Sequence, residues 1–255
     1  MRYRNALGIL VTLACLLAMW QIYIWVSHTP TYVLPTPAQT LRAARAHPGL
    51  LLRRSATTME AAVLGLAASV LVAVALALAI ARWTVLEHVI LTYALLIRTL
   101  PIVGVAPIVT LVAGRGLATS VLCVMVVTVF SLLIAVIQGF DGQPAELREL
   151  ADVYHTGFAR RARLCLLPGA MGSMLQGMRS AAPLAVLGAL LAEWLDGFPG
   201  VGSLMVLAQA DQEIELLMAA AVTAVALSLV AFAVVDVATA VASRRGYRVD
   251  QLSAP

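Results

Sequence analysis

Long uninterrupted apolar runs dominate this chain of 255 residues and limit its fold more than any other feature. A helix needs about 20 mainly apolar residues to cross the hydrocarbon core of a bilayer. Backbone hydrogen-bonding groups must be satisfied internally in lipid, so runs of that length form helices. The runs lie at about 6–26, 57–81, 85–112, 117–140, 171–195 and 216–242. The sequence therefore predicts an all-α membrane protein with about six transmembrane helices.

The composition agrees with a membrane protein. Hydrophobic residues make up 62% of the chain and charged residues only 12%, whereas soluble domains have roughly 45–50% apolar and about 25% charged residues. The arginine clusters lie beside apolar runs, as juxtamembrane charges do. The net charge of +4 therefore does not indicate nucleic acid as a partner.

The first apolar run is predicted to be a retained helix rather than a signal peptide. It is longer than the usual signal core of about 7–15 residues, and Ser27–Pro30 offers no small-residue cleavage site. Trp20, Tyr23 and Trp25 near its far end are typical of an interfacial aromatic belt.

The distribution of arginine predicts a cytoplasmic N-terminus. Six spans in that orientation place residues 82–85, 141–170 and 243–255 in the cytoplasm, and cytoplasmic loops are enriched in basic residues. The arginines predicted inside are 2, 4, 82, 148, 160, 161, 163, 244, 245 and 248, and those predicted outside are 42, 45, 53, 54 and 115.

Three shorter features are expected between or within the spans. Leu41–Arg54 alternates apolar residues with arginine, which predicts a short amphipathic helix on the outer membrane face. Pro101 and Pro107 predict kinks or breaks in the third span. Ser203–Gln209 is expected to form a short helix.

The chain is expected to have one core domain with short flanking parts. Residues 1–56 comprise the first transmembrane helix and the external amphipathic segment, 57–245 form the transmembrane core with a cytoplasmic loop at 141–170, and 246–255 form a cytoplasmic tail.

Several kinds of chemistry are excluded or disfavoured. All 17 basic residues are arginine, so the chain has no lysine for a Walker A nucleotide site or a Schiff base. Its three cysteines and four histidines form neither a disulfide framework nor a metal-ligand motif. We expect no enzymatic activity, no metal site and no cofactor in this chain.

A charged stretch of twenty residues, Glu149–Pro168, interrupts the apolar pattern. It resembles the EAA loop of binding-protein-dependent ABC importer permeases, in which Glu-Ala-Ala is followed by a glycine and a closing Leu-Pro. Glu149, Ala151 and Pro168 are in register with that pattern. Leu150 replaces the first alanine, and His155 replaces the glycine, with Gly157 two residues later.

Other blocks are similar to the sulfonate, taurine, nitrate and pyrimidine-precursor branch of the same family. They occur at 34–37, 98–107, 177–181 and 192–193, and the resemblance covers about residues 30–245. Glu60 departs from it, because that branch has a basic residue there.

The resemblance implies a type I importer permease in the bacterial inner membrane. Its partners would be a second copy of this chain, two copies of a cytoplasmic ATPase that binds ATP and Mg, an external solute-binding protein and membrane lipid. The ATPase-coupling residues would be Glu149, Leu150, Ala151, Val153, Tyr154, His155, Gly157 and Pro168. The cargo would be a small polar nutrient: a sulfonate, a nitrate-like anion, or a pyrimidine- or vitamin-type compound.

Charged residues inside spans have two interpretations. They are costly in lipid and usually face a cavity or a partner, so Arg98, Pro101, Arg179 and Glu193 are candidates for a translocation path. Alternatively, Arg98 with Glu193, or Arg179 with Asp236, form pairs that hold helices together. Both interpretations remain open at this level.

The main competing function is an ion-coupled secondary transporter or channel. Such a protein commonly contains an inverted repeat, and the sequence shows no clear repeat. A membrane-embedded enzyme is disfavoured by the absence of histidine or cysteine clusters and of paired carboxylates.

Overall fold

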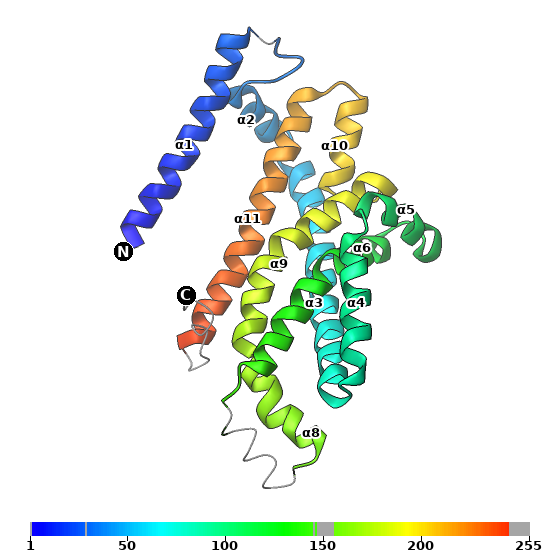
Figure 1. Cartoon of the computed structure of the whole chain (residues 1–255). Coiled ribbons are helices and arrows are strands. Elements are labelled where there is room, and N and C mark those ends of the chain that lie inside the picture. Colours follow the sequence, from blue (N-terminus) through cyan, green and yellow to red (C-terminus); the bar gives the residue numbers. More distant parts are fainter. Residues whose placement is uncertain (1, 29, 145, 147–155, 245–255) are drawn as a thin grey trace.

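The computed structural model describes residues 2–28, 30–144, 146 and 156–244, and within these ranges every regular element is a helix. The helices form an elongated bundle beside which α1 stands apart (Figure 1). In chain order they are α1 (Arg2–Ser27), α2 (Pro37–Ala46), α3 (Pro48–Arg82), α4 (Val85–Thr99), α5 (Ile102–Ala113), α6 (Leu117–Asp141), α8 (Phe158–Arg161), the π-helical turn η1 (Ala162–Leu166), α9 (Leu167–Asp196), α10 (Val201–Ala210) and α11 (Ile214–Arg244).

Among the residues that the structure describes, four helical stretches are long and apolar enough to cross a membrane: α3, α6, the continuous run Phe158–Asp196 and α11. The bent pair α4 and α5 passes the same test when taken as one span. Helix α1 has 26 residues, which corresponds to about 39 Å at 1.5 Å per residue. The all-helical membrane fold is confirmed, whereas the total of six spans stays a prediction.

The two ends of the bundle carry different connections. The α3–α4 turn, α8 and the far end of α11 lie toward one end, and α2 and α10 lie toward the other, while the N-terminal end of α1 reaches about halfway along the bundle (Figure 1). The sequence assigned these groups to opposite membrane faces. The cytoplasmic identity of the first face stays a prediction.

The expected single amphipathic helix over Leu41–Arg54 is wrong. α2 ends at Ala46, and α3 begins at Pro48 and continues to Arg82. A proline disfavours helical conformation in the residue before it and suits the first turn of a new helix. His47 therefore separates the two helices, and α3 runs without interruption through the expected domain boundary at 56–57.

The expected break in the third span is confirmed at Pro101. α4 ends at Thr99, α5 begins at Ile102, and their axes differ by 104°. Pro107 lies inside α5 without ending it. After Gly114, whose φ of +79° suits a glycine, the chain turns into α6.

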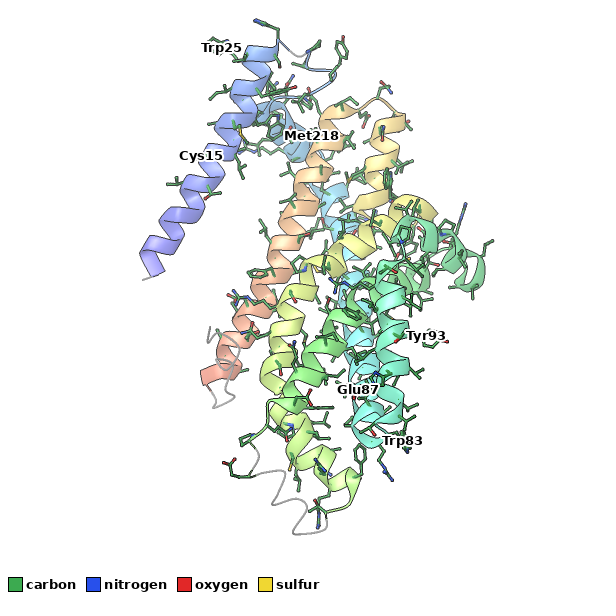
Figure 2. The ribbon with its side chains drawn as sticks, in the orientation of Figure 1. Cys15, Trp25, Trp83, Glu87, Tyr93 and Met218 are labelled. Atoms are coloured by element: carbon green, nitrogen blue, oxygen red, sulfur yellow. The ribbon has the colours of Figure 1, made fainter. Side chains whose placement is uncertain are left out.

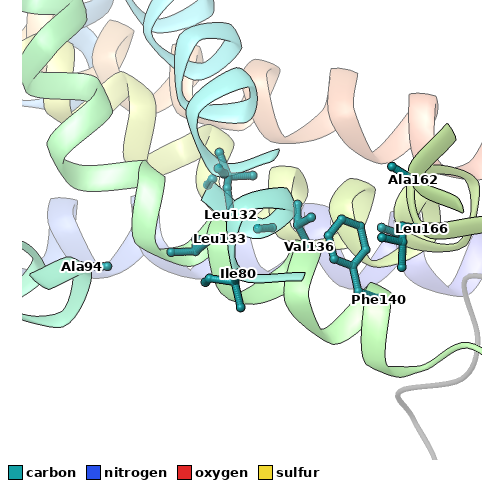
Figure 3. Close-up of a cluster of buried hydrophobic side chains, with 12 residues drawn as sticks. Ile80, Ala94, Leu132, Leu133, Val136, Phe140, Ala162 and Leu166 are labelled. Atoms are coloured by element: carbon teal, nitrogen blue, oxygen red, sulfur yellow. The ribbon is translucent and has the colours of Figure 1, made fainter. Parts of the chain in front are cut away.

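The core is built mainly where α6 packs against α3 and α9. Leu132, Leu133, Val136 and Phe140 of α6 are buried there together with Ile80 of α3 (Figure 3). Because lipid supplies no hydrophobic drive between helices, close approach depends on small residues. A Cβ added at Gly65 of α3 would lie 2.5 Å from the Val124 side chain of α6, and one added at Gly188 of α9 would lie 3.1 Å from the Val124 Cα.

Small residues of α3 and α9 differ in how far they are buried. Gly188 and Ser69 are buried, and the Ser69 and Thr128 hydroxyls share a hydrogen bond of 2.7 Å. Ala67, two residues before Ser69 on α3, is exposed.

Candidate functional site

The first half of the predicted coupling loop lies outside the described residues. Glu149, Leu150, Ala151, Val153, Tyr154 and His155 belong to this part. Their assignment to ATPase coupling stays a prediction.

The second half of the loop is helical and joins the bundle directly. Gly157 precedes α8, and the helix continues through η1 into α9, so Pro168 lies in the first turn of α9 instead of ending a loop. Proline has no N–H to donate to the carbonyl four residues earlier. A π turn lies just ahead of Pro168, and local π adjustments accompany prolines in membrane helices.

Gln143 ties this helical exit to the end of α6. Its Nε2 donates to the carbonyl oxygen of Cys165 at 3.0 Å and lies 3.4 Å from that of Leu166. On the other side, the Arg82 guanidinium lies 5.7 Å from the ring centroids of both Trp83 and Phe158. The helix that leaves the loop is therefore held between α6 and the α3–α4 turn.

A buried carboxylate organises the opposite end of α9. Glu193 is fully buried, and its Oε2 accepts hydrogen bonds from the Thr58 hydroxyl and the Gly202 N–H, each at 2.9 Å. The Val201 N–H donates to the Thr58 hydroxyl oxygen at 2.9 Å. An acid at a helix N-terminus satisfies free N–H groups and complements the helix dipole. Glu193 and Thr58 thus jointly cap α10 and join it to α3 and α9.

The loop between α9 and α10 is shaped to fit this carboxylate. A Cβ at Gly200 would overlap the Glu193 carboxyl group. The Gly200 N–H donates to the Ser203 hydroxyl at 3.0 Å, and Arg54 of α3 lies 3.3 Å from the same hydroxyl. Nearby, Asp196 Oδ1 accepts a hydrogen bond from the Phe198 N–H at 2.7 Å.

The sequence singled out Glu193 but not its partners. Thr58 resembles any other threonine in an apolar run. The need for a glycine at position 200 is seen only once the position of the Glu193 carboxylate is known. The available signal was the cluster of glycines directly after Asp196. The expected Arg98–Glu193 pair is wrong: Glu193 faces α10, and Arg98 lies elsewhere.

Arg98 lies at the break between α4 and α5. Its guanidinium is 4.9 Å from the ring centroid of Phe130 of α6. Residues 95–101, including Pro101, are exposed in the isolated chain. α4 buries only Ala94, and Tyr93 points away from the bundle (Figure 2).

The alternative pair, Arg179 with Asp236, is present. The Arg179 Nε and the Asp236 Oδ1 are 3.0 Å apart, joining α9 to α11. Phe232, one turn before Asp236, has its ring centroid 5.0 Å from the same guanidinium. The two charged side chains remain 41% and 43% exposed, so this pair is only half covered by its own chain.

The chain combines apolar spans, a broken helix with an intramembrane charge, and a long helix that continues from a charged loop. These features are typical of a membrane-embedded permease. Residues 55–246 match the family described as binding-protein-dependent transport system inner membrane components. The chain belongs to this family and is the multi-pass inner-membrane permease of an ABC importer.

Three relatives illustrate the similarity. A probable ABC transporter permease protein of Haemophilus influenzae is 26% identical over 89% of this chain and 93% of its own length. The riboflavin transport system permease protein RibX of Chloroflexus aurantiacus is 30% identical over 88% of this chain and 84% of its own. The formylaminopyrimidine transport permease protein ThiX of Halalkalibacterium halodurans is 27% identical over 73% of this chain and 75% of its own.

Membership of this family implies that the chain works with an ATPase and a solute-binding protein. It also removes the competing interpretation of the sequence as an ion-coupled secondary transporter.

Proposed function

We propose that two copies of this chain form the path of an ATP-driven importer for a small heteroaromatic nutrient of the vitamin or pyrimidine type. A separate cytoplasmic ATPase binds ATP and Mg and hydrolyses ATP, and an external solute-binding protein delivers the cargo. The chain itself performs no catalysis and holds no cofactor. The observation that carries this proposal is the broken helix at Leu100–Pro101 beside Arg98.

The break is incompatible with a surface that faces lipid. Irregular backbone within a membrane is tolerated only where protein buries it or a water-filled cavity adjoins it. An arginine at the centre of a span costs roughly 2.5–3.5 kcal/mol on insertion scales. Because Arg98 and Pro101 are exposed in the single chain, we infer that they face the path or a second copy.

The half-covered Arg179–Asp236 pair supports the same arrangement. An ion pair with two-fifths of its side-chain surface exposed would lose much of its solvation against acyl chains. Water in a path, or the second copy, would cover it. Glu193 is different, because its carboxylate is enclosed within the chain in this conformation.

Coupling to the ATPase would use the loop 149–168. Glu149, Leu150, Ala151, Val153, Tyr154 and His155 would contact the ATPase, and Gly157 and Pro168 would set the exit of the loop. The uninterrupted helix Phe158–Asp196 supports this role, since a displacement at the loop would be passed along a stiff element to Arg179.

The proposed cargo class rests on the relatives that align over most of this chain. Two of them are named as transport permeases for riboflavin and for formylaminopyrimidine. Both compounds are flat, polar and rich in hydrogen-bonding groups. Arg98 and Arg179 would suit such cargo, because a guanidinium group both stacks on rings and donates hydrogen bonds.

The test is uptake into proteoliposomes that contain this chain, its ATPase and its binding protein. We expect ATP-dependent uptake of a labelled flavin or pyrimidine, and Glu149→Arg should abolish uptake while the protein still purifies folded. Glu87→Arg, at the exposed start of α4, is the matched control and should retain uptake. Uptake that follows an ion gradient without the ATPase, or normal uptake by Glu149→Arg, would overturn the proposal.

A further inference from the structure

A polar pocket lies between α2 and the turn from α10 into α11, at the opposite end of the bundle from α8 (Figure 1). Its volume is about 570 Å³, within the range of about 300–1,000 Å³ that is common for binding pockets. Its lining residues come from 31–47 on one side and from 212–216 on the other. Ala43 and Leu216 are buried members of an apolar cluster, so the pocket has an apolar floor under a polar rim.

The rim carries charges of both signs. Arg42 of α2 lines one side, Glu213 and Glu215 line the other, and all three side chains are exposed. Within the part of the chain that the structure describes, none of them forms an ion pair. The pocket can therefore accept an acidic group on its α2 side and a basic group on its α11 side.

Both walls are fixed before any partner arrives. At the start of α2, the Thr36 N–H donates to Gln39 Oε1 at 2.8 Å, and the Gln39 N–H donates to the Thr36 hydroxyl at 3.3 Å. At the other wall Gln212 has a φ of +61°, and the Glu213 N–H donates to the Ala208 carbonyl at 2.8 Å. This is the closing pattern of a Schellman motif. A preformed site loses less conformational freedom on binding.

The pocket lies where water, rather than acyl chains, is the surrounding medium. Helix α11 has 31 residues, which is about 46 Å at 1.5 Å per residue, whereas the hydrocarbon core is about 30 Å thick. Acidic and basic side chains are costly within that core. The start of α11, flanked by Glu213 and Glu215, therefore projects beyond it, and the pocket is open to a soluble partner.

The family of this chain indicates which soluble partner that is. Its members are binding-protein-dependent, and the sequence predicts that this end of the bundle faces outward. Tyr32 lines the pocket and is 75% exposed, and tyrosine and arginine are the residue types that most often anchor protein interfaces. The family match begins at residue 55, so the wall formed by residues 31–47 lies outside the segment that the family model covers.

We propose that this pocket is where the solute-binding protein docks, and that the wall of residues 31–47 selects one binding protein over others. This inference rests on the function proposed above. An acidic side chain of the binding protein pairs with Arg42, a basic one pairs with Glu213 or Glu215, and Tyr32 packs against the surface between them. Charges placed in this way set the orientation of the complex and speed its formation.

Photo-crosslinking tests the position of the docking surface. The transporter, assembled with its ATPase in lipid nanodiscs, carries p-benzoylphenylalanine in place of Tyr32 or in place of Tyr93. Tyr93 is the matched control, because it is 64% exposed but points away from the bundle on α4 (Figure 2). The probe is the binding protein that supports uptake in proteoliposomes. We expect it to be cross-linked from position 32 and not from position 93.

Charge reversal tests the recognition itself, with affinity for the same binding protein measured by biolayer interferometry. Arg42→Glu and Glu213→Arg should each weaken binding at least fivefold at low salt, and the effect should shrink as salt screens the charges. Arg45→Glu and Asp211→Arg are the controls, because these exposed residues flank the pocket without lining it. They should change the affinity less than twofold.

Four results would overturn the proposal. Unchanged affinity in Arg42→Glu and Glu213→Arg would place the docking surface elsewhere and leave the proposed importer function intact. A cross-link from position 32 to a second copy of this chain would make the pocket an interface between permeases. A cross-link to phospholipid alone would place the pocket within the membrane. If no binding protein binds the unmodified transporter and uptake proceeds without one, the proposed function itself fails.

Discussion

Replacing Thr58 by valine removes the hydroxyl group that joins α3 to both α9 and α10. Valine keeps nearly the same shape, so the change tests hydrogen bonding rather than packing. In the structure the Thr58 hydroxyl accepts from the Val201 N–H and donates to Glu193 Oε2, both at 2.9 Å. Thr58 itself is fully buried, so water cannot replace either bond.

The cost follows from the two groups that lose a partner. The Val201 N–H becomes an unsatisfied buried donor, at about 1–3 kcal/mol, and Glu193 loses one of its two donors, at about 1.5–3 kcal/mol for a bond to a charged acceptor. We therefore expect Thr58→Val to lower the free energy of unfolding by roughly 2.5–6 kcal/mol. Thr58→Ser keeps the hydroxyl and should cost about 1 kcal/mol for the lost methyl group.

The measurement is unfolding of the purified chain in mild detergent, followed by far-UV circular dichroism as denaturant increases. Thr223→Val is the matched control, because the Thr223 hydroxyl donates only to the Ala219 carbonyl of its own helix at 2.8 Å. It should change stability by less than about 1 kcal/mol. If Thr58→Val and Thr223→Val unfold at the same denaturant concentration, the proposed joint cap of α10 is refuted.

Three further predictions concern the other contacts. Gly200→Ala should destabilise the chain by about 1–3 kcal/mol, because the new methyl group overlaps the Glu193 carboxyl and overpacking costs that much; denaturant unfolding checks it. Asp236→Asn should leave Arg179 in the membrane without its partner and destabilise the chain by more than the double exchange Arg179→Asp with Asp236→Arg, which restores a pair; both are compared by the same unfolding assay. Pro101→Ala should reduce uptake in proteoliposomes at least severalfold while leaving the protein folded, because the residue no longer disfavours a straight helix from α4 into α5.

Each of these predictions has a control or an opposing result. Gly49→Ala is the control for Gly200→Ala, since nothing lies within 4 Å of a Cβ at Gly49, and it should not destabilise the chain. If the double exchange Arg179→Asp with Asp236→Arg is as unstable as Asp236→Asn, the ion pair between α9 and α11 does not stabilise the chain. Uptake by Pro101→Ala at the unmodified rate would mean that the break does not shape the path.

The sequence predicted the parts of the fold that depend on local physics. The apolar runs gave the long helices, and Pro101 gave the broken third span, because a proline disrupts a helix wherever it occurs in the interior. The boundary between α2 and α3 was missed although Pro48 signalled it, since the alternation of leucine and arginine through 41–54 suggested one continuous amphipathic helix. The conformational restriction that Pro48 places on His47 therefore set the helix boundary, although the hydrophobic pattern continued across it.

Contacts between segments far apart in the chain could not be predicted from the local sequence. Arg98 had Glu193 as one candidate partner, but the fold places the carboxylate at the N-terminus of α10 and the arginine against Phe130. Thr58 carried no signal of its own, because its role depends on Val201 and Glu193, which lie 143 and 135 residues away. Such contacts follow from the helix arrangement and can be recognised only after it is known.

The membrane reverses the usual meaning of an exposed side chain. In water, the exposed valines and leucines of α4, α5 and α11 would mark an interface, but against acyl chains they cost nothing. The informative exposure is polar: Arg98 at the helix break, and Arg179 with Asp236 between α9 and α11. A surface that faced lipid would leave each of these groups poorly solvated, so water or protein must lie there.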